Sequence, residues 1–365
     1  MQVVEFRPGT LRFLEAVPQQ APQDGFIWIF LDREELQEQV ARLQQAVQAI
    51  GGSTLLELHL KDLANRAHPS NYDYTSTYDL VIFRRLATEQ EVRAELGAEA
   101  VADNSPLAAF GRVRTRALGF VVFDRLLLSV HPAGCQSARS FIERYLGDLV
   151  QSEGIPAAAR SRLPVSPADL MLRMINVMVD SYLDLRKVLS GELDAWQQAL
   201  LGPAGRAADW GALMSARNAL HMLEDLCEEQ NDAMQEWLDT QREQPSATMS
   251  PAEREGLMAR ARDVVEHIQR VVHHVRRMES AAENAVQIHF SAQGHRTNEI
   301  MRTLTALTAI FLPLNLIAGI FGMNFEFLPF TKQHAGVYWI LGTMVAIAGV
   351  LGMVFWRKRY LARTR

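Results

Sequence analysis

The amino-acid sequence predicts an α/β domain followed by long helices and two C-terminal membrane-spanning helices. In residues 1–150, compact β-type runs alternate with helical patterns, and no β-type run recurs after Pro164. Two apolar runs without a charge stand near the C-terminus, Thr303–Phe325 and Ala335–Trp356. Strands interleaved with helices favour a layered α/β domain. An apolar run of about 20 residues is long enough to cross a bilayer as a helix.

The N-terminal region contains four predicted strands and one amphipathic helix. The predicted strands are Phe26–Leu31, Tyr78–Arg84, Ala117–Phe123 and Arg125–Val130. Apolar residues recur with helical spacing from Arg33 to about Ile50, and the Gly51-Gly52 pair predicts the end of that helix. Only Asp124 separates the last two strands, so we expect a tight hairpin or a bulge there.

Three long helices are predicted after this region, and they span Ala168–Leu201, Met214–Arg242 and about Pro251–Phe321. Ser166-Pro167 predicts the first of these starts, because serine caps a helix and proline suits its first turn. The third helix continues into the first apolar run and would be roughly 100 Å long at 1.5 Å per residue. A helix of that length cannot bury its faces alone, so it needs neighbours or copies of itself.

Charges beside the apolar runs predict the orientation of the chain in a membrane. The tail at 357–365 carries five cations, whereas the connecting loop carries only Lys332. Positive residues in short segments stay on the cytoplasmic side. We therefore expect both termini in the cytoplasm and the loop outside.

Composition narrows the class of protein. The net charge of −5 and the lack of a basic stretch interleaved with aromatic residues give no indication of a nucleic-acid partner. Cys135 and Cys227 are the two cysteines, which fits a reducing compartment, and Met1–Phe6 does not read as a signal peptide. Neither a glycine-rich phosphate loop nor a supported nucleophile grouping is present, so we do not expect an enzyme.

The first apolar run has a polar face. Steps of three and four residues from Asn298 collect most of its polar groups and two glycines: Asn298, Met301, Thr305, Thr308, Leu312, Asn315, Gly319 and Gly322. The opposite face carries apolar residues suited to lipid or to the second run: Leu307, Ile310, Phe311, Leu314 and Ile317. Packing between membrane helices is one interpretation of the threonines and glycines. The asparagine amides need a partner helix or water, and two spans cannot enclose a channel, so a water-lined face implies several copies around an axis.

The end of this run carries a recognisable motif. Gly322-Met323-Asn324 extends to Pro329, and upstream stand Asn298–Arg302 and Phe311–Leu314 followed by Ile317-Ala318-Gly319. With these residues the chain resembles the CorA family of divalent-cation channels, within the broader group that includes the zinc transporter ZntB. The similarity is close over about residues 290–362 and only architectural over the first 150.

The resemblance implies a funnel-shaped homopentamer in the inner (plasma) membrane, with the first span lining a pore for Mg²⁺ or also for Co²⁺ or Ni²⁺. It implies an outer filter of Gly322, Met323 and Asn324, in which Asn324 would hydrogen-bond a hydrated ion. Met323 is better interpreted as packing than as a ligand. The implied pore-lining residues are Asn298, Met301, Leu304, Thr305, Thr308, Leu312 and Asn315. Glu326 would be the loop's carboxylate, and Arg357, Lys358 and Arg359 would form a basic ring at the inner mouth. No covalently bound cofactor is expected, and the partners are lipid, divalent cations and further copies of the chain.

The predicted organisation follows the chain. A cytoplasmic α/β domain covers 1–150, a long-helix stalk 151–297, a pore-lining helix 298–323, an external loop 324–334, an outer helix 335–356 and a basic tail 357–365.

Two departures from the family pattern keep other functions open. Phe330 stands where typical members have an acidic residue, and Gln287 where some members have an aspartate. The alternatives are a zinc transporter of the ZntB kind and a CorA-derived scaffold or regulator with an altered or sealed pore. The stalk histidines, among them His267, His273 and His274, are interpreted as solvated. So is a cluster on the second helix, His221, Glu224, Asp225 and Cys227, although it could attract Mg²⁺ in a pentamer.

Overall fold

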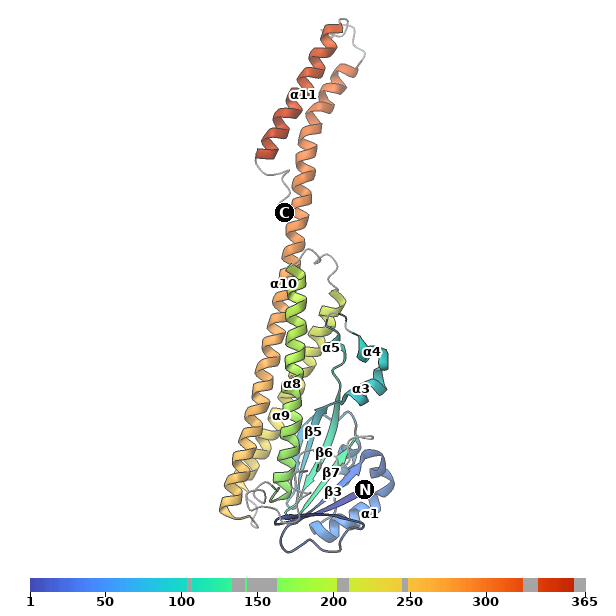
Figure 1. Ribbon diagram of the computed structural model, residues 1–365, viewed down its shortest axis with the longest axis vertical. Helices are drawn as coiled ribbons and strands as arrows, with labels where there is room; N and C mark the ends of the chain where they lie inside the picture. The colour runs from blue at the N-terminus through green and yellow to red at the C-terminus, as the bar shows by residue number, and fades with distance from the viewer. Residues whose placement is uncertain are drawn as a thin grey trace. The chain divides into compact units, whose positions relative to one another are not determined.

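The computed structural model describes residues 1–103, 105, 107–132, 142, 163–201, 210–244, 249–323 and 334–357. The chain divides into two compact units, Met1–Glu283 and Asn284–Arg365, which are described separately below (Figure 1). The domain boundaries predicted above stay predictions, and the boundary at residue 150 lies outside the described residues.

A mixed seven-stranded sheet forms the centre of the first unit. Its strands are β1 (Gln2–Arg7), β2 (Thr10–Leu14), β3 (Phe26–Asp32), β4 (Asn71–Tyr74), β5 (Asp79–Leu86), β6 (Thr115–Val122) and β7 (Leu126–His131). They lie in the order β2-β1-β3-β7-β6-β5-β4, and β3 and β7 pair in parallel whereas the other neighbours pair antiparallel. All four predicted strands are present. The expected tight hairpin joins β6 to β7, where Val122 lies opposite Leu127.

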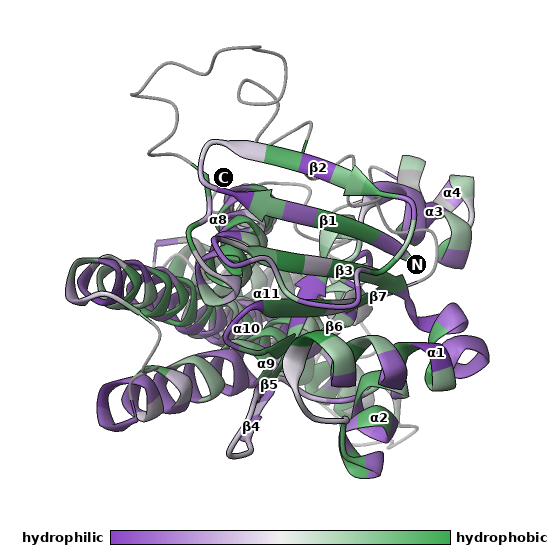
Figure 2. Ribbon diagram, turned by 90° about the horizontal axis from the view of Figure 1, so that it is seen from below, coloured by the Kyte–Doolittle hydropathy of each residue, from purple (hydrophilic) through white to green (hydrophobic). Residues whose placement is uncertain are grey.

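Two helices cover one face of this sheet. α1 (Arg33–Gly51) and α2 (Glu57–Ala64) share a buried core with inward-facing residues of β3, β5, β6 and β7. α1 ends as predicted, with Gly52 in the left-handed conformation at φ 83°. α2 lies so close to β6 that a Cβ added to Gly119 would stand 2.2 Å from Leu63 Cδ2. In Figure 2 the strands β3 and β7 are mostly hydrophobic, whereas α1 carries hydrophilic residues on its outer side.

The other face of the sheet is covered by α8 (Pro167–Leu201) and α9 (Trp210–Glu243). Tyr182 of α8 and Gln230 of α9 both donate hydrogen bonds to the carbonyl oxygen of Arg84 in β5, at 2.8 and 2.6 Å. These contacts tie both helices to one strand. Three short helices follow β5 in the chain: α3 (Glu89–Leu96), α4 (Ala98–Ala102) and α5 (Ala108–Gly111).

The predicted third long helix is α10 (Pro251–Gly322), a single helix of 72 residues. In the first unit its buried residues recur every three or four positions: Leu257, Ala261, Val264, Ile268, Val271, Val275, Met278 and Ala282. Polar contacts join it to both neighbours, since Arg260 pairs with Asp169 of α8 and Arg276 with Glu224 of α9. The predicted helices are confirmed, and within the described residues no strand follows β7.

In the second unit α10 is followed by α11 (His334–Arg357). Each of these helices is long and apolar enough to cross a membrane. A core helix of a soluble protein would be mostly buried, yet only 6% of the most apolar window of α10 and none of that of α11 is buried. This large apolar surface indicates that the two helices meet lipid or further copies of the chain.

Candidate functional site

The candidate pore helix is the C-terminal part of α10, and one of its faces is covered. The covered face carries buried or half-buried residues at helical spacing: Ala306, Ile310, Pro313, Leu314, Ile317 and Phe321. α11 has a matching half-buried row: Ile340, Met344, Ile347, Ala348, Leu351 and Phe355. Figure 1 shows α11 alongside the C-terminal part of α10, and from the two half-buried rows we infer that these sides of the helices face each other.

The predicted polar face lies opposite this contact. Its members are all exposed: Asn298, Met301, Thr305, Thr308, Leu312, Asn315, Gly319 and Gly322. Leu304, the remaining predicted pore residue, is 56% exposed. At 100° per residue the polar face and the covered row lie on opposite sides of α10. The second span therefore does not cover the polar face. The covered side is the apolar one that the sequence pattern assigned to lipid or to the second span.

The polar groups on this face differ in how they are satisfied. Thr305 Oγ1 donates to the carbonyl oxygen of Met301 at 2.7 Å, and Thr308 Oγ1 to that of Leu304 at 2.9 Å. Threonine hydroxyls bonded to their own helix are compatible with lipid or helix packing. Within the described part of the chain, the amides of Asn298 and Asn315 have no such hydrogen bond. The two asparagines are therefore the groups that require water or another chain.

The outer end of α10 is described only as far as Met323. Gly322 is the last helical residue, and the exposed Met323 donates its backbone N–H to the carbonyl oxygen of Ile320 at 3.4 Å. Asn324, Glu326 and Phe330 lie outside the described residues, as do Lys358 and Arg359 of the predicted basic ring. Arg357 is the exposed last residue of α11.

The stalk histidines are less solvated than predicted. His273 is exposed, but the His267 side chain is only 20% exposed and lies 3.6 Å from Asp180 of α8. His274 Nε2 lies 2.7 Å from Arg186 Nη1, also on α8, and burial is the main reason that the pKa of His274 is lowered. The interpretation of His267 and His274 as solvated is wrong because both lie in the contact between α8 and α10.

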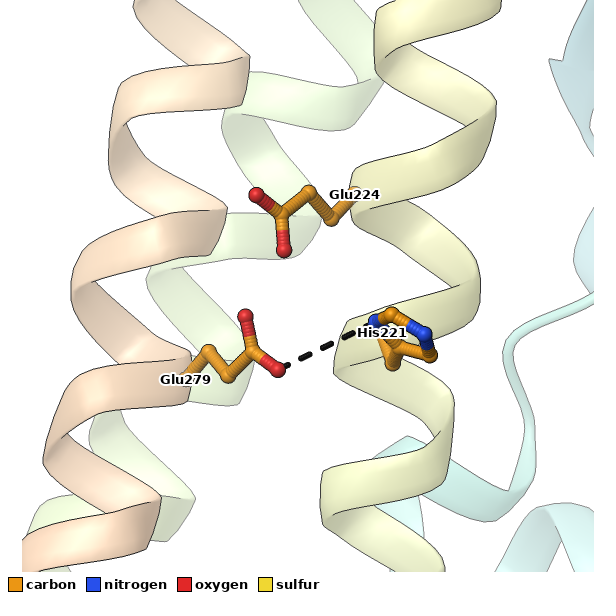
Figure 3. A group of neighbouring side chains, drawn as sticks. All are labelled: His221, Glu224 and Glu279. Carbon is orange, nitrogen blue, oxygen red and sulfur yellow. Dashed lines mark ion pairs between the residues drawn. The ribbon is translucent and has the colours of Figure 1, made fainter.

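The cluster expected on α9 has a different membership in space. Cys227 is fully buried, and burial raises its thiol pKa to about 12, while Asp225 is exposed away from the others. His221 and Glu224 instead meet Glu279 of α10, and one possible ligand atom from each of the three lies within 4.8 Å of the other two. Figure 3 shows the two carboxyl groups and the imidazole directed toward one another from the two facing helices.

Glu279 could not be found from sequence, because 55 residues separate it from Glu224 and only the packing of α10 on α9 joins them. A hydrogen bond between the two carboxyl groups is the main reason that the pKa of Glu224 is lowered and that of Glu279 is raised. Arg276 Nε donates to Glu224 Oε1 at 2.7 Å and its other end reaches Glu228. One imidazole nitrogen of His221 and one carboxylate oxygen each of Glu224 and Glu279 are close enough together to hold a cation.

In the comparison with known proteins, a family model and an individual relative point to the same family. The model of the family described as CorA-like Mg2+ transporter protein matches residues 23–359. The cobalt/magnesium transport protein CorA of Thermotoga maritima is 26% identical over 193 residues, which cover 53% of this chain and 52% of that relative. The chain thus spans about half the length of this relative.

Two solved structures resemble the fold over nearly the whole chain. The CorA magnesium transporter of Methanocaldococcus jannaschii has a TM-score of 0.71 at 16% identity and covers 98% of both chains. The full-length CmaX protein has a TM-score of 0.65 at 16% identity, with 98% of this chain and 97% of that chain covered. At these identities the likeness shows the fold alone.

Proposed function

Because this chain belongs to the CorA-like Mg2+ transporter family, we propose that it conducts Mg²⁺ across the inner membrane through a pore formed by five copies. The C-terminal part of α10 lines this pore and α11 faces lipid. Membership in a family of transporters also supports a role without catalysis. Both termini lie in the cytoplasm, as the cations after α11 favour.

The observation that carries the proposal is the uncovered polar face of α10. α11 packs on the opposite side, and Asn298 and Asn315 have no partner among the described residues. An amide without a hydrogen-bond partner in hydrocarbon costs about 2–7 kcal/mol. A ring of copies that encloses water removes this cost for every copy, whereas a lipid-facing position does not.

The proposed filter is the ring of Asn324 side chains at the outer end of this face, beside Gly322 and Met323. Mg²⁺ gives up its waters reluctantly, so amide oxygens that accept hydrogen bonds from a hydrated ion suit it. Glu326 supplies negative charge in the outer loop. At the other end, Arg357, Lys358 and Arg359 form the basic ring. Met301, Leu304 and Leu312 narrow the pore and gate it by excluding water.

Flux of Mg²⁺ into proteoliposomes tests the proposal. The parent protein is expected to pass Mg²⁺, and Asn324→Ala is expected to pass Mg²⁺ with altered selectivity or rate. The mass of the purified protein in detergent should correspond to five chains. A parent that moves no divalent cation, or that stays a monomer or dimer, contradicts the proposal.

Cysteine accessibility tests the face itself. In a background with Cys135→Ser, Asn315→Cys and Thr308→Cys should react with a charged, water-soluble thiol reagent, whereas Ile310→Cys should not. Ile310 is a matched control because it lies on the same helix at the α11 contact. If the three cysteines react at the same rate, water does not reach one face of α10 in preference to another, and a pore lined by α10 is contradicted.

A zinc transporter of the ZntB kind is the second candidate. The His221, Glu224 and Glu279 cluster favours it, because imidazole is a ligand for zinc rather than for magnesium. Zn²⁺ uptake that requires a pH gradient, with no Mg²⁺ flux, would support this candidate over the channel. Absence of any flux from an assembled pentamer would favour the scaffold alternative.

A further inference from the structure

The first unit contains a set of metal-ligating side chains that lies outside the proposed pore. His221 and Glu224 are one turn apart on α9, and Glu279 faces them from α10. Their nearest ligand atoms all lie within 4.8 Å of one another (Figure 3). A single ion bound by three ligands at about 2.0–2.2 Å brings the ligand atoms to about 3–4 Å from each other, so small side-chain rotations suffice.

The donor set selects the kind of metal. One imidazole nitrogen and two carboxylate oxygens are ligand types that zinc accepts, and catalytic zinc sites combine three protein ligands with a fourth position for water. Mg²⁺ prefers an octahedron of oxygen atoms and seldom takes a nitrogen ligand. The histidine therefore distinguishes this set from a surface group of acidic residues.

The charged side chains around the cluster also favour the binding of a cation. The ion pairs across this part of the α9–α10 contact use four carboxylates, Glu224, Glu228, Glu279 and Glu283, but only two guanidinium groups, Arg217 and Arg276. With all four carboxylates ionised, four negative and two positive charges leave an excess of two, and one divalent ion neutralises this excess.

The neighbouring arginine leaves room for the ion. Arg276 Nε donates a hydrogen bond to Glu224 Oε1 at 2.7 Å. The other carboxylate oxygen of Glu224 is therefore the one that can bind metal. The Glu224 and Glu279 side chains are 17% and 23% exposed, whereas that of His221 is 67% exposed. The site is thus walled by two helices and opens to solvent on the histidine side.

We propose that His221, Glu224 and Glu279 bind one Zn²⁺ ion, or a similar first-row divalent metal, and that this ion clamps α9 to α10. Because α10 continues without interruption to Gly322, the clamp acts on the same helix that carries the polar face. Binding of the ion does not depend on whether the protein transports anything.

Titration of the full-length protein in detergent with ZnCl₂ tests the proposal. The parent should bind one Zn²⁺ per chain that is lost from Glu279→Gln and from His221→Ala, with affinity reduced at least about tenfold, since loss of a residue that merely orients a ligand costs about 10- to 100-fold. Asp225→Asn and His273→Ala are matched controls, because both residues are exposed on the same two helices outside the cluster. Zn²⁺ binding that survives in both ligand variants, or is lost equally in the controls, overturns the proposal.

Binding of Co²⁺ to this site can be followed by its visible absorption, a measurement that does not depend on transport. Co²⁺ in a four-coordinate site with one nitrogen ligand absorbs visible light strongly, and this absorption should appear in the parent but not in His221→Ala. Excess Mg²⁺ should not remove it. Displacement of Co²⁺ by Mg²⁺ would overturn the assignment to a transition metal. The ligand variants must keep the elution volume of the parent, which separates loss of a ligand from loss of the fold.

Discussion

Asp79 gives a quantitative test of how α9 is joined to the sheet. It is the first residue of β5, and its carboxyl group accepts hydrogen bonds from Gln241 Nε2 of α9 at 2.8 Å and from the Tyr72 hydroxyl of β4 at 3.3 Å. Burial between these elements raises the pKa of Asp79 from 3.8 to about 6, and the charge of Asp124 contributes in the same direction.

The sign of the effect follows from the raised pKa. The folded protein binds this proton more tightly than the unfolded chain, so the stabilisation is complete below about pH 4 and is lost as pH rises through about 6. A pKa change from 3.8 to about 6 corresponds to about 3 kcal/mol, since each tenfold change in proton affinity is worth about 1.4 kcal/mol. At neutral pH the ionised carboxylate therefore weakens the joint by this amount.

Asp79→Asn removes the titration while keeping the size of the side chain. We expect the variant to lack the fall in stability between about pH 4 and pH 7 that the parent shows. The assay is the thermal midpoint of the full-length protein in detergent across this range, with the difference between variant and parent changing by about 6–12 °C, at about 2–4 °C per kcal/mol. Asp232→Asn, an exposed carboxylate on α9, is the control. Parallel pH curves for Asp79→Asn and the parent would refute the reasoning.

Three further predictions concern the pore face, the core and the thiol. Asn315→Leu should lower Mg²⁺ flux into proteoliposomes at least about tenfold, since a hydrogen bond to a charged group is worth about 1.5–3 kcal/mol; Thr308→Val should change flux little, because that hydroxyl already bonds its own helix. Gly119→Ala should destabilise the first unit by about 1–3 kcal/mol, because the added methyl group overlaps with a leucine of α2. Gly191→Ala in α8 is the control and should stabilise the unit, because its added methyl group meets nothing within 4 Å. A thermal midpoint that falls for Gly119→Ala alone shows that steric overlap, and not the loss of a glycine in general, is the cause. Cys227 should resist maleimide until the protein is denatured, because it is fully buried with a thiol pKa of about 12; rapid labelling of the native protein, in a background without the other cysteine, would show that α9 is not packed as described.

Several elements were predictable because their signal is local. Phe26–Asp32 is a short continuous run of apolar residues, and α1 ends at a glycine in the left-handed conformation that other residues avoid. β1 and β2 were missed, since Glu5, Arg7 and Arg12 interrupt their apolar residues. They lie at one end of the sheet, where β1 pairs with β3 and β2 pairs with β1, so they are strands because of this pairing and not because of a local apolar pattern.

The candidate site was predictable in part for the same reason. The polar face of α10 follows from helical spacing alone, because every member lies on one continuous helix. Which side of α10 is covered became clear only from the structure, in which Ala306 is buried and Ile310 is half-buried. Spacing could not decide whether the threonines need water, because their hydroxyls turn back to carbonyl oxygens of their own helix.

By itself, the sequence determined α1, the three long helices, the four central strands, the two apolar spans and the polar face, because each depends on residues within a few turns or one strand. Only the tertiary structure decided which residues from distant segments meet. In the structure Glu279 lies beside His221 and Glu224. Cys227 is buried and Asp225 is exposed away from this cluster. His267 and His274 lie in the contact between α10 and α8. The physical reason is that side chains on different helices come together through the packing of whole helix faces, which no spacing along one chain segment records.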